Sequence, residues 1–282
     1  MAELRFVSWN LNNFSQARGA DKVELLRDLR WDVAALQECG RRTYELILST
    51  LGDVDGVHAL DVTPSSRRRN HYGCALLSRV GPFSNPRVWP APPRPADVPE
   101  APFPESCLFA SIDTRDRHLT AVSFHAPHAA GRSQSERTWR IARKNAAYRQ
   151  LVEGLNATTG TVIVGMDGNV WTDPVELHTV DPDHPQVDVL SFHLKDPPHR
   201  VIDVYRTWLS HPDQRSELLR LQPDGPLATT YNRRKSGEPK YERMDRVYAT
   251  ADVTVTGVCH GYQEARAVGS DHAFVVASLE VP

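Results

Sequence analysis

The segment TVIVGMDGN, from Thr161 to Asn169, decides the fold class of this chain. Its first six residues, 161–166, are apolar and rich in β-branched side chains, which predicts a buried β-strand. Asp167-Gly168-Asn169 then has the composition of a turn, so polar side chains leave the strand where it ends. Strand ends are where a rigid sheet holds side chains that converge on one site. The segment therefore predicts both a core strand and one part of a polar site.

Similar apolar runs recur along the chain and predict further strands. These strands cover residues 4–9, 33–37, 72–78, 107–112, 119–125, 244–249, 253–258 and 273–281. Amphipathic patterns predict helices over residues 22–30, 42–51 and 135–155, with Ser133 or Ser135 as the cap of the longest one. Many strands and few helices predict an α+β fold in which two sheets pack together with helices outside.

A proline-rich segment separates two of these strands. Nine of the 21 prolines lie between Pro82 and Pro104, which excludes a helix or a central strand there. Because strand patterns stand on both sides, we predict a surface loop over about residues 81–105 within a single domain spanning residues 1–282, and not a linker between domains.

Composition excludes several classes of protein. The chain has 282 residues, 40% of them hydrophobic, and a net charge of −2, which is typical of a globular protein and argues against binding nucleic acid through bulk charge. Its apolar runs fall short of the roughly 20 residues of a membrane span, and we see no secretory signal. The four cysteines lack zinc-like spacing. We expect a cytoplasmic protein with no membrane anchor and no obligate protein partner.

Polar residues stand at the ends of the other predicted strands as well. They are Asn10, Glu38, His125 and Asp245, and the pair Asp271-His272 before the last strand. Any one of them could be a turn residue, a helix cap or half of an ion pair. Their complementary chemistry is harder to explain in that way, and together they predict a catalytic site.

The chemistry of these residues fits hydrolysis of a phosphoester. Asn10, Glu38 and Asp271 offer hard oxygen ligands, which suit Mg²⁺, with Mn²⁺ as a substitute, and suit zinc poorly. His272 can contact a phosphoryl oxygen or exchange a proton. The amide of Asn169 can bind a nucleophilic water without adding negative charge.

Taken in order, the motifs WNLNN, LQE, YGCALLS, HAP, GMDGN, RMDRVYA and SDH resemble those of the endonuclease/exonuclease/phosphatase superfamily, and they run from residue 9 to residue 272. The resemblance implies a four-layer αββα sandwich. It also implies that Glu38 is the main metal ligand with Asn10 beside it, and that Asp167 and Asn169 bind the attacking water. Asp271 would then orient His272. Asp245 matches an acidic residue of the family and His125 a histidine of its deoxyribonuclease I, sphingomyelinase and phosphatase branches.

The branch of the superfamily is less well defined by sequence. Arg69-Asn70-His71-Tyr72 is similar to the stretch by which deoxyribonuclease I meets a DNA minor groove, so Arg69, Asn70 and Tyr72 are predicted substrate contacts, with a solvated turn as the alternative. In LATTYN, residues 227–232, only Tyr231 is aromatic; it is a further predicted contact, but an abasic-site pocket is not evident there.

Three functions stay open on the sequence. The first is a Mg²⁺-dependent nuclease acting on DNA or RNA, favoured by the basic triplets Arg67-Arg68-Arg69 and Arg233-Arg234-Lys235. The second is a phosphatase or phosphodiesterase for a small metabolite or a lipid head group. The third is a non-catalytic binding protein, disfavoured because the catalytic motifs are intact. A basic run over residues 132–149, which includes Lys144, is expected to be a solvated helix face.

Overall fold

The structure is a computed structural model, and it describes residues 2–12, 18–62, 72–88, 106–114, 117–129, 133–170, 181–194, 197–214, 216, 231–235 and 238–282. The predicted proline-rich loop lies outside the described residues from residue 89 to residue 105, as do Arg69 and Asn70.

The first sheet has six strands in the order β13-β14-β1-β2-β4-β3. In chain order they are β1 (Ala2–Asn10), β2 (Val33–Gly40), β3 (Asp55–His58), β4 (Tyr72–Ser78), β13 (Thr254–Gly261) and β14 (Phe274–Val281). Strands β1 and β2 pair in parallel, and the other neighbours are antiparallel.

The second sheet also has six strands, in the order β5-β6-β7-β8-β12-β9. They are β5 (Phe83–Val88), β6 (Cys107–Thr114), β7 (Arg117–His125), β8 (Thr161–Asp167), β9 (Val201–Asp203) and β12 (Asp245–Thr250). Here β7 and β8 form the parallel pair. The long helix α4 (Gln134–Ala157) connects them, as a parallel crossover requires.

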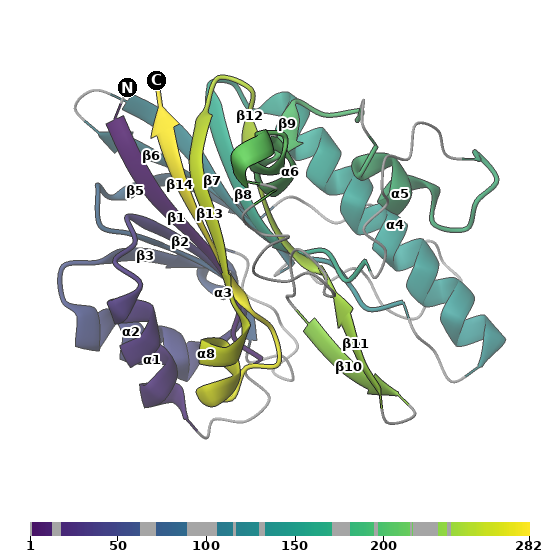
Figure 1. Cartoon of the computed structure of the whole chain (residues 1–282), viewed down its shortest axis with the longest axis horizontal. Coiled ribbons are helices and arrows are strands. Elements are labelled where there is room, and N and C mark those ends of the chain that lie inside the picture. Colours follow the sequence, from purple (N-terminus) through teal and green to yellow (C-terminus); the bar gives the residue numbers. More distant parts are fainter. Residues whose placement is uncertain are drawn as a thin grey trace.

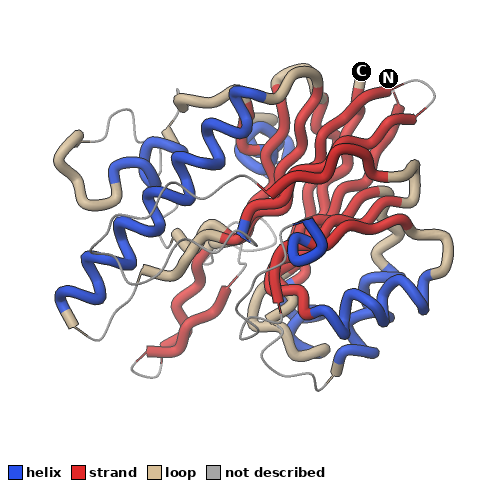
Figure 2. The backbone as a smooth tube through the Cα atoms, turned by 180° about the vertical axis from the view of Figure 1, so that it is seen from behind, coloured by secondary structure: helices blue, strands red, loops and turns tan. Residues whose placement is uncertain are grey.

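The two sheets pack face to face, and helices cover their outer faces (Figures 1 and 2). Alternation along β1 shows how the sequence builds these layers: Phe6 belongs to the core between the sheets, whereas Val7 and Trp9 belong to the outer cluster beneath the helices. That outer cluster includes side chains of α1 (Gly19–Asp28), α2 (Arg41–Leu51) and α8 (Tyr262–Ala267). On the other side, α4 and α5 (Val187–Phe192) pack on β8. The predicted α+β fold, the αββα sandwich, is confirmed.

The proline-rich segment departs from the prediction at its start. Residues 83–88 are not loop but strand β5, which lies at the edge of its sheet. Proline is tolerated there because an edge strand leaves backbone groups unpaired, and the register shift between Ser84 and Arg87 places Pro86 in a bulge. Sequence reasoning also missed the hairpin of β10 (Tyr231–Lys235) and β11 (Glu238–Glu242).

One of the two predicted cap residues begins the longest helix, α4. The Ser133 hydroxyl accepts a hydrogen bond from the Glu136 backbone N–H at 3.1 Å, so Ser133 and not Ser135 is the N-cap. The expectation of a solvated basic face is wrong for one member, because Lys144 is only 2% exposed.

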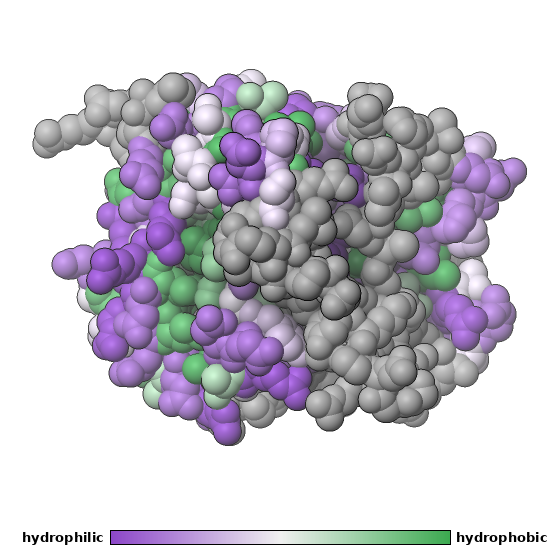
Figure 3. Space-filling model, in the orientation of Figure 1, coloured by the Kyte–Doolittle hydropathy of each residue, from purple (hydrophilic) through white to green (hydrophobic). Residues whose placement is uncertain are grey.

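On the face shown in Figure 3, most of the described surface is hydrophilic, with apolar groups showing mainly in one area at the left of the view. Among the described residues, the large hydrophobic side chains that are exposed are Leu46 and Val80. None of the described helices combines the length and the apolar character needed to cross a bilayer.

Candidate active site

Strand register brings three of the predicted residues together at one end of the interior strands of the second sheet. In the parallel pair β7–β8, His125 lies opposite Asp167, and in the antiparallel pair β8–β12 Asp245 lies opposite Asp167. The strand ends therefore converge as their polar residues predicted.

The first sheet contributes Asn10 and Glu38 from the ends of β1 and β2. The Asn10 amide donates a hydrogen bond to Asp167 Oδ2 at 2.8 Å, which links the two sheets directly. Glu38 lies where the β2–β4 register shifts between Leu36 and Cys39, and its φ is +46°. A bulge of this kind aims a side chain away from the regular pleat, and a left-handed glutamate is an uncommon, strained conformation.

Asp167 is the centre of a chain of alternating carboxylates and imidazoles. His125 Nε2 lies 3.6 Å from Asp167 Oδ2 and 3.4 Å from Glu38 Oε1. On the other side His272 Nε2 lies 3.9 Å from Asp167 Oδ2, and His272 Nδ1 lies 2.9 Å from Asp245 Oδ2. Asp167 and Asp245 are 1% and 0% exposed, so these charges interact largely out of water.

The buried charges determine the protonation of the cluster. Burial by itself would raise the pKa of Asp167, but the two imidazoles and the hydrogen bonds from Asn169 N and Asn10 outweigh it, and the pKa is lowered. Burial likewise opposes a charge on His272, but Asp245 and Asp167 raise its pKa to about 10. At neutral pH the cluster therefore holds an ionised Asp167 beside a protonated His272.

The partner that orients His272 is not the predicted one. Asp245 contacts His272 Nδ1 with both carboxylate oxygens, at 2.9 and 3.1 Å. Asp271, the neighbour in sequence, instead accepts a hydrogen bond from the Asn12 amide at 2.6 Å. The expected role of Asp271 in orienting His272 is corrected: Asp271 turns to Asn12, and Asp245 reaches His272 from β12 of the facing sheet.

Asn169 is held in one orientation by its neighbours. Its backbone N–H donates to Asp167 Oδ1 at 2.9 Å, its φ is +48°, and its Nδ2 donates to the Ala126 carbonyl at 2.7 Å. Because that carbonyl can only accept, the amide nitrogen must face it. The Asn169 Oδ1 then has no hydrogen-bond partner among the described residues and remains an acceptor for a ligand.

A buried lysine that sequence reasoning missed supports the turn after β1. Lys22 on α1 is 2% exposed, and its Nζ donates to the Leu11 carbonyl at 2.5 Å and to the Asn12 carbonyl at 3.4 Å. Its position beside the buried Val23 and Leu26 on the predicted helix was the available signal.

The predicted substrate contacts are only partly placed. Tyr72 begins β4, is half-buried and lies opposite Gly40 in register, two residues beyond Glu38. Tyr231 begins β10, and its side chain lies outside the described part of the structure, as do Arg69 and Asn70.

Two sets of residues at the site offer ligand atoms for a divalent cation, and one set fits a hard cation better than the other. Glu38, Asn10 and Asp271 offer oxygen atoms only, the donor set that Mg²⁺ prefers. Asp167, Asp245 and His272 also bring ligand atoms within 4.8 Å of one another. A metal ligand must be a neutral imidazole, whereas without a metal Asp245 and Asp167 hold His272 protonated. The oxygen-only set is therefore the better candidate for a hard cation.

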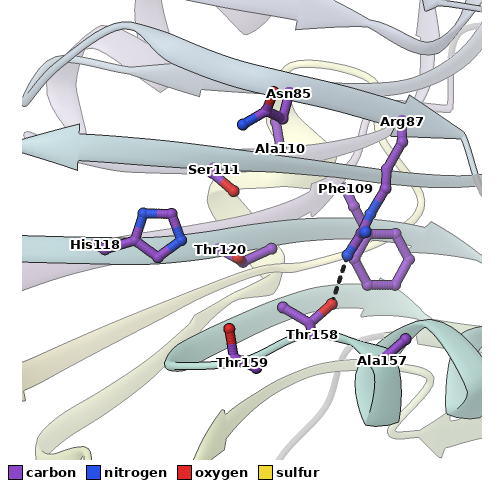
Figure 4. Close-up of a pocket in the computed structure, with 10 residues that line it drawn as sticks. All are labelled: Asn85, Arg87, Phe109, Ala110, Ser111, His118, Thr120, Ala157, Thr158 and Thr159. Atoms are coloured by element: carbon purple, nitrogen blue, oxygen red, sulfur yellow. Dashed lines mark hydrogen bonds between the residues drawn. The ribbon is translucent and has the colours of Figure 1, made fainter.

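A cavity of about 280 Å³ lies elsewhere, between β5, β6, β7 and the C-terminal end of α4 (Figure 4). Its lining includes His118, near the start of β7, whereas His125 ends the same strand at the carboxylate cluster. Arg87 crosses one end of it and donates to the Thr158 hydroxyl at 2.6 Å. None of the predicted catalytic residues lines this cavity, so it is separate from the candidate active site.

Known proteins share this architecture. The sequence model of the Endonuclease/Exonuclease/phosphatase family matches residues 7–272. No curated protein sequence matches the chain. An endonuclease/exonuclease/phosphatase structure from Bacteroides vulgatus superposes with a TM-score of 0.67 at 15% identity, covering 100% of each chain. D. rerio TDP2 complexed with single-strand DNA product gives 0.64 at 15%, also over 100% of each chain. The human Nocturnin catalytic domain with bound sulfate anion gives 0.63 at 15%, over 99% of this chain and 95% of that one.

Two packed sheets with carboxylates and imidazoles gathered at one edge define a phosphoesterase, a hydrolase of phosphoester bonds. The chain belongs to the Endonuclease/Exonuclease/phosphatase family. The enzymes of this family depend on a divalent metal ion.

Proposed function

We propose that this protein is a Mg²⁺-dependent phosphodiesterase that hydrolyses nucleic acid by attack of water on phosphorus. The observation that carries the proposal is the chain of groups centred on Asp167, in which an ionised carboxylate and a protonated imidazole face each other at 3.9 Å. Hydrolysis of a phosphodiester uses both the carboxylate and the imidazole, because a proton must leave the attacking water while negative charge grows on the phosphoryl oxygens.

Glu38, with Asn10 and Asp271, is the proposed holder of the metal. When bound, Mg²⁺ supplies Lewis-acid stabilisation of the phosphoryl oxygens. The unusual backbone of Glu38 supports this role, because residues in strained conformations cluster at functional sites.

Asp167 and Asn169 are the proposed water-binding pair. The ionised Asp167 carboxylate can accept a proton from water, and Asn169 Oδ1, which has no partner among the described residues, can accept a hydrogen bond from the same water. His125 contacts the carboxylates of both Glu38 and Asp167 and thereby joins the two parts of the site.

His272 is the proposed donor to the substrate. Its pKa of about 10 makes it an acid and not a base at neutral pH, so its Nε2–H can stabilise charge on a phosphoryl oxygen. Asp245 fixes the ring through Nδ1.

Nucleic acid is the proposed substrate class because a basic hairpin leads into Asp245. The β10–β11 hairpin, which carries Arg233-Arg234-Lys235, leads into Asp245 through Arg243 and Met244, and it projects beyond the sheets near the N-terminal half of α4 (Figure 1). The DNA-bound TDP2 structure, similar over its whole length, supports the same class.

The test is a plasmid-nicking and oligonucleotide digest in Mg²⁺, in Mn²⁺ and in EDTA, with Glu38→Gln and His272→Gln as variants. Metal-dependent cutting by the wild type, reduced in each variant by about 100-fold or more, is expected. A folded wild type that leaves DNA and RNA intact but releases phosphate from small metabolites would overturn the choice of substrate.

The hairpin has a test of its own. Replacing Arg233-Arg234-Lys235 by alanines is expected to raise KM for an oligonucleotide several-fold and to weaken its salt dependence, while sparing a small chromogenic phosphodiester. Equal effects on both substrates would argue against contact with a polymer.

The cytoplasmic location stays a prediction.

A further inference from the structure

Helix α4 presents two buried donors to consecutive carbonyls of the turn that ends β8. Lys144 Nζ donates to the Asn169 carbonyl at 2.5 Å, and the Tyr148 hydroxyl donates to the Gly168 carbonyl at 2.8 Å. The two side chains are four residues apart, so they stand on the same face of the helix one turn apart. Neither takes part in the reaction proposed above.

Both donors are placed where water does not reach them. Lys144 is 2% exposed and Tyr148 is 0% exposed. Burying an ammonium group is unfavourable unless it is hydrogen-bonded, and burial lowers the pKa of Lys144 to about 8. On this face of α4 the lysine continues the buried row formed by Tyr148, Leu151 and Leu155, a position that an apolar side chain would fill at less cost.

The turn itself is fitted to these donors. A Cβ at Gly168 would lie 2.8 Å from the Tyr148 hydroxyl oxygen, 3.3 Å from Met166 Cε and 3.4 Å from the Met244 carbonyl, so the glycine allows the close approach. The Gly168 N–H also donates to that Met244 carbonyl at 2.9 Å. Asn169, whose carbonyl accepts the hydrogen bond from Lys144, has a left-handed conformation with a φ of +48°.

We propose that Lys144 and Tyr148 form a clamp on residues 167–169 and act as positioning residues for the hydrolytic reaction. The carbonyls they hold belong to the peptide groups on either side of Asn169, so the clamp sets the direction of the Asn169 amide and of its N–H bond to Asp167. This inference rests on the proposed function of Asn169 in binding the attacking water.

A double-mutant cycle tests whether the clamp acts through Asn169. Lys144→Met keeps an unbranched side chain one atom shorter than lysine and removes the donor, and Tyr148→Phe removes one hydroxyl. Each is expected to lower kcat by about 10- to 100-fold with KM nearly unchanged, because a small displacement of a reacting group has an effect of this order. In an Asn169→Ala background neither change is expected to lower kcat further.

Tyr248→Phe is the matched control. It removes a buried hydroxyl from the same aromatic cluster, and that hydroxyl contacts His193 Nδ1 at 2.7 Å and not the turn. Because His193 Nε2 lies 3.4 Å from the Tyr148 hydroxyl, this control separates the loss of the histidine contact from the loss of the carbonyl contact. Its kcat is expected to equal that of the wild type. Clamp variants that keep the wild-type kcat, or that lose the same factor with and without Asn169, would overturn the proposal.

A second readout does not depend on activity. Hydrogen exchange at the Asn169 amide, which donates to Asp167 Oδ1, is expected to be faster by about tenfold in Lys144→Met and in Tyr148→Phe, and unchanged in Tyr248→Phe. If Lys144→Met does not fold, Tyr148→Phe carries the test alone. A wild type inactive on every phosphodiester would refute the proposed function, while unchanged exchange would refute the clamp.

Discussion

Glu38 shows how much one backbone position contributes to the site. Its φ of +46° costs a non-glycine residue about 1 kcal/mol or more. Burial also raises the pKa of its carboxyl, so the charged form is disfavoured in the folded protein. A residue that is unfavourable in both respects contributes little to folding, as expected of the metal ligand proposed above.

We expect Glu38→Gln to abolish metal-dependent turnover and to increase the free energy of unfolding in metal-free buffer at pH 7. The reason follows from the direction of the shift: a carboxyl whose folded pKa is raised destabilises the fold above its unfolded pKa, and the neutral amide removes that penalty. Urea unfolding with EDTA measures it.

Glu280→Gln makes the same change on β14, away from the site, and is expected to leave both activity and metal dependence unaltered. A Glu38→Gln protein that is less stable than the wild type in EDTA would show that the carboxylate supports the fold.

Single residues were predictable where their polarity interrupts an apolar run. Asn10, His125, Asp167 and Asp245 were singled out in this way. Strand register brings the last three together, and a hydrogen bond to Asp167 joins Asn10 to them. The partner of His272 was not predictable, because Asp271 is its neighbour in the sequence whereas Asp245 is 27 residues away and only the fold brings it to Nδ1. Lys144 was missed because a charged residue in a basic run is normally solvated.

At the scale of elements, the close approach of β8 to the first sheet holds the two halves of the site together. A Cβ at Gly165 would lie 2.7 Å from Ala35 Cβ and 2.8 Å from Ser8 Oγ, so glycine lets the sheets touch here. Two residues further along β8, Asp167 accepts its hydrogen bond from Asn10 across the same interface.

Gly165→Ala is therefore expected to lower the free energy of unfolding by about 1–3 kcal/mol and also to lower kcat, because overpacking pushes the sheets apart beneath the site. Gly257→Ala on β13 is the control, since a Cβ there would meet nothing closer than Ser278 Cβ at 3.7 Å. Equal stability of the two variants in urea would contradict this account.

Elements with a regular pattern of apolar residues were predictable, and elements that depend on their place in the fold were not. The 24 residues of α4 follow the predicted helix closely, and β4 has the predicted bounds. Strand β5 was missed because its one proline, Pro86, excludes it from a central position but not from an edge. The β10–β11 hairpin consists mostly of charged and other polar residues, so no alternation of apolar and polar residues marked it.

At the scale of the whole molecule, buried histidines make stability depend on pH. Burial lowers the pKa of His199 to about 4 and of His260 to about 3, from an ordinary value of 6.5. The neighbouring His193 is lowered well below that value, first by burial and then by Arg246. In all three cases the unfolded chain binds protons that the folded protein excludes.

The free energy of unfolding is therefore expected to fall as the pH drops from about 7 towards 4, by up to about 1.4 kcal/mol per pH unit for each such histidine. His272 acts in the opposite direction: its raised pKa gives stability that is full below pH 6.5 and lost as the pH rises towards 10. Urea titrations from pH 4 to pH 10 should thus show a maximum near neutrality.

His199→Gln is expected to flatten the acid side of that curve, because it removes one of the buried imidazoles that the folded protein keeps neutral. A curve that is flat between pH 7 and pH 5 would contradict the burial of neutral imidazoles.

The pairing of the first strand with the last has a consequence for how the protein is made. Ala2 lies opposite Val281, and β14 occupies an interior place between β13 and β1 (Figure 1). While the ribosome is still translating, β1 has β2 on one side and nothing on the other. The first sheet can be completed only after β14 has emerged from the exit tunnel. Until then the nascent chain exposes the unpaired, apolar edge of β1. We expect chaperones that shield such edges to raise the yield during synthesis more than during refolding of the finished chain.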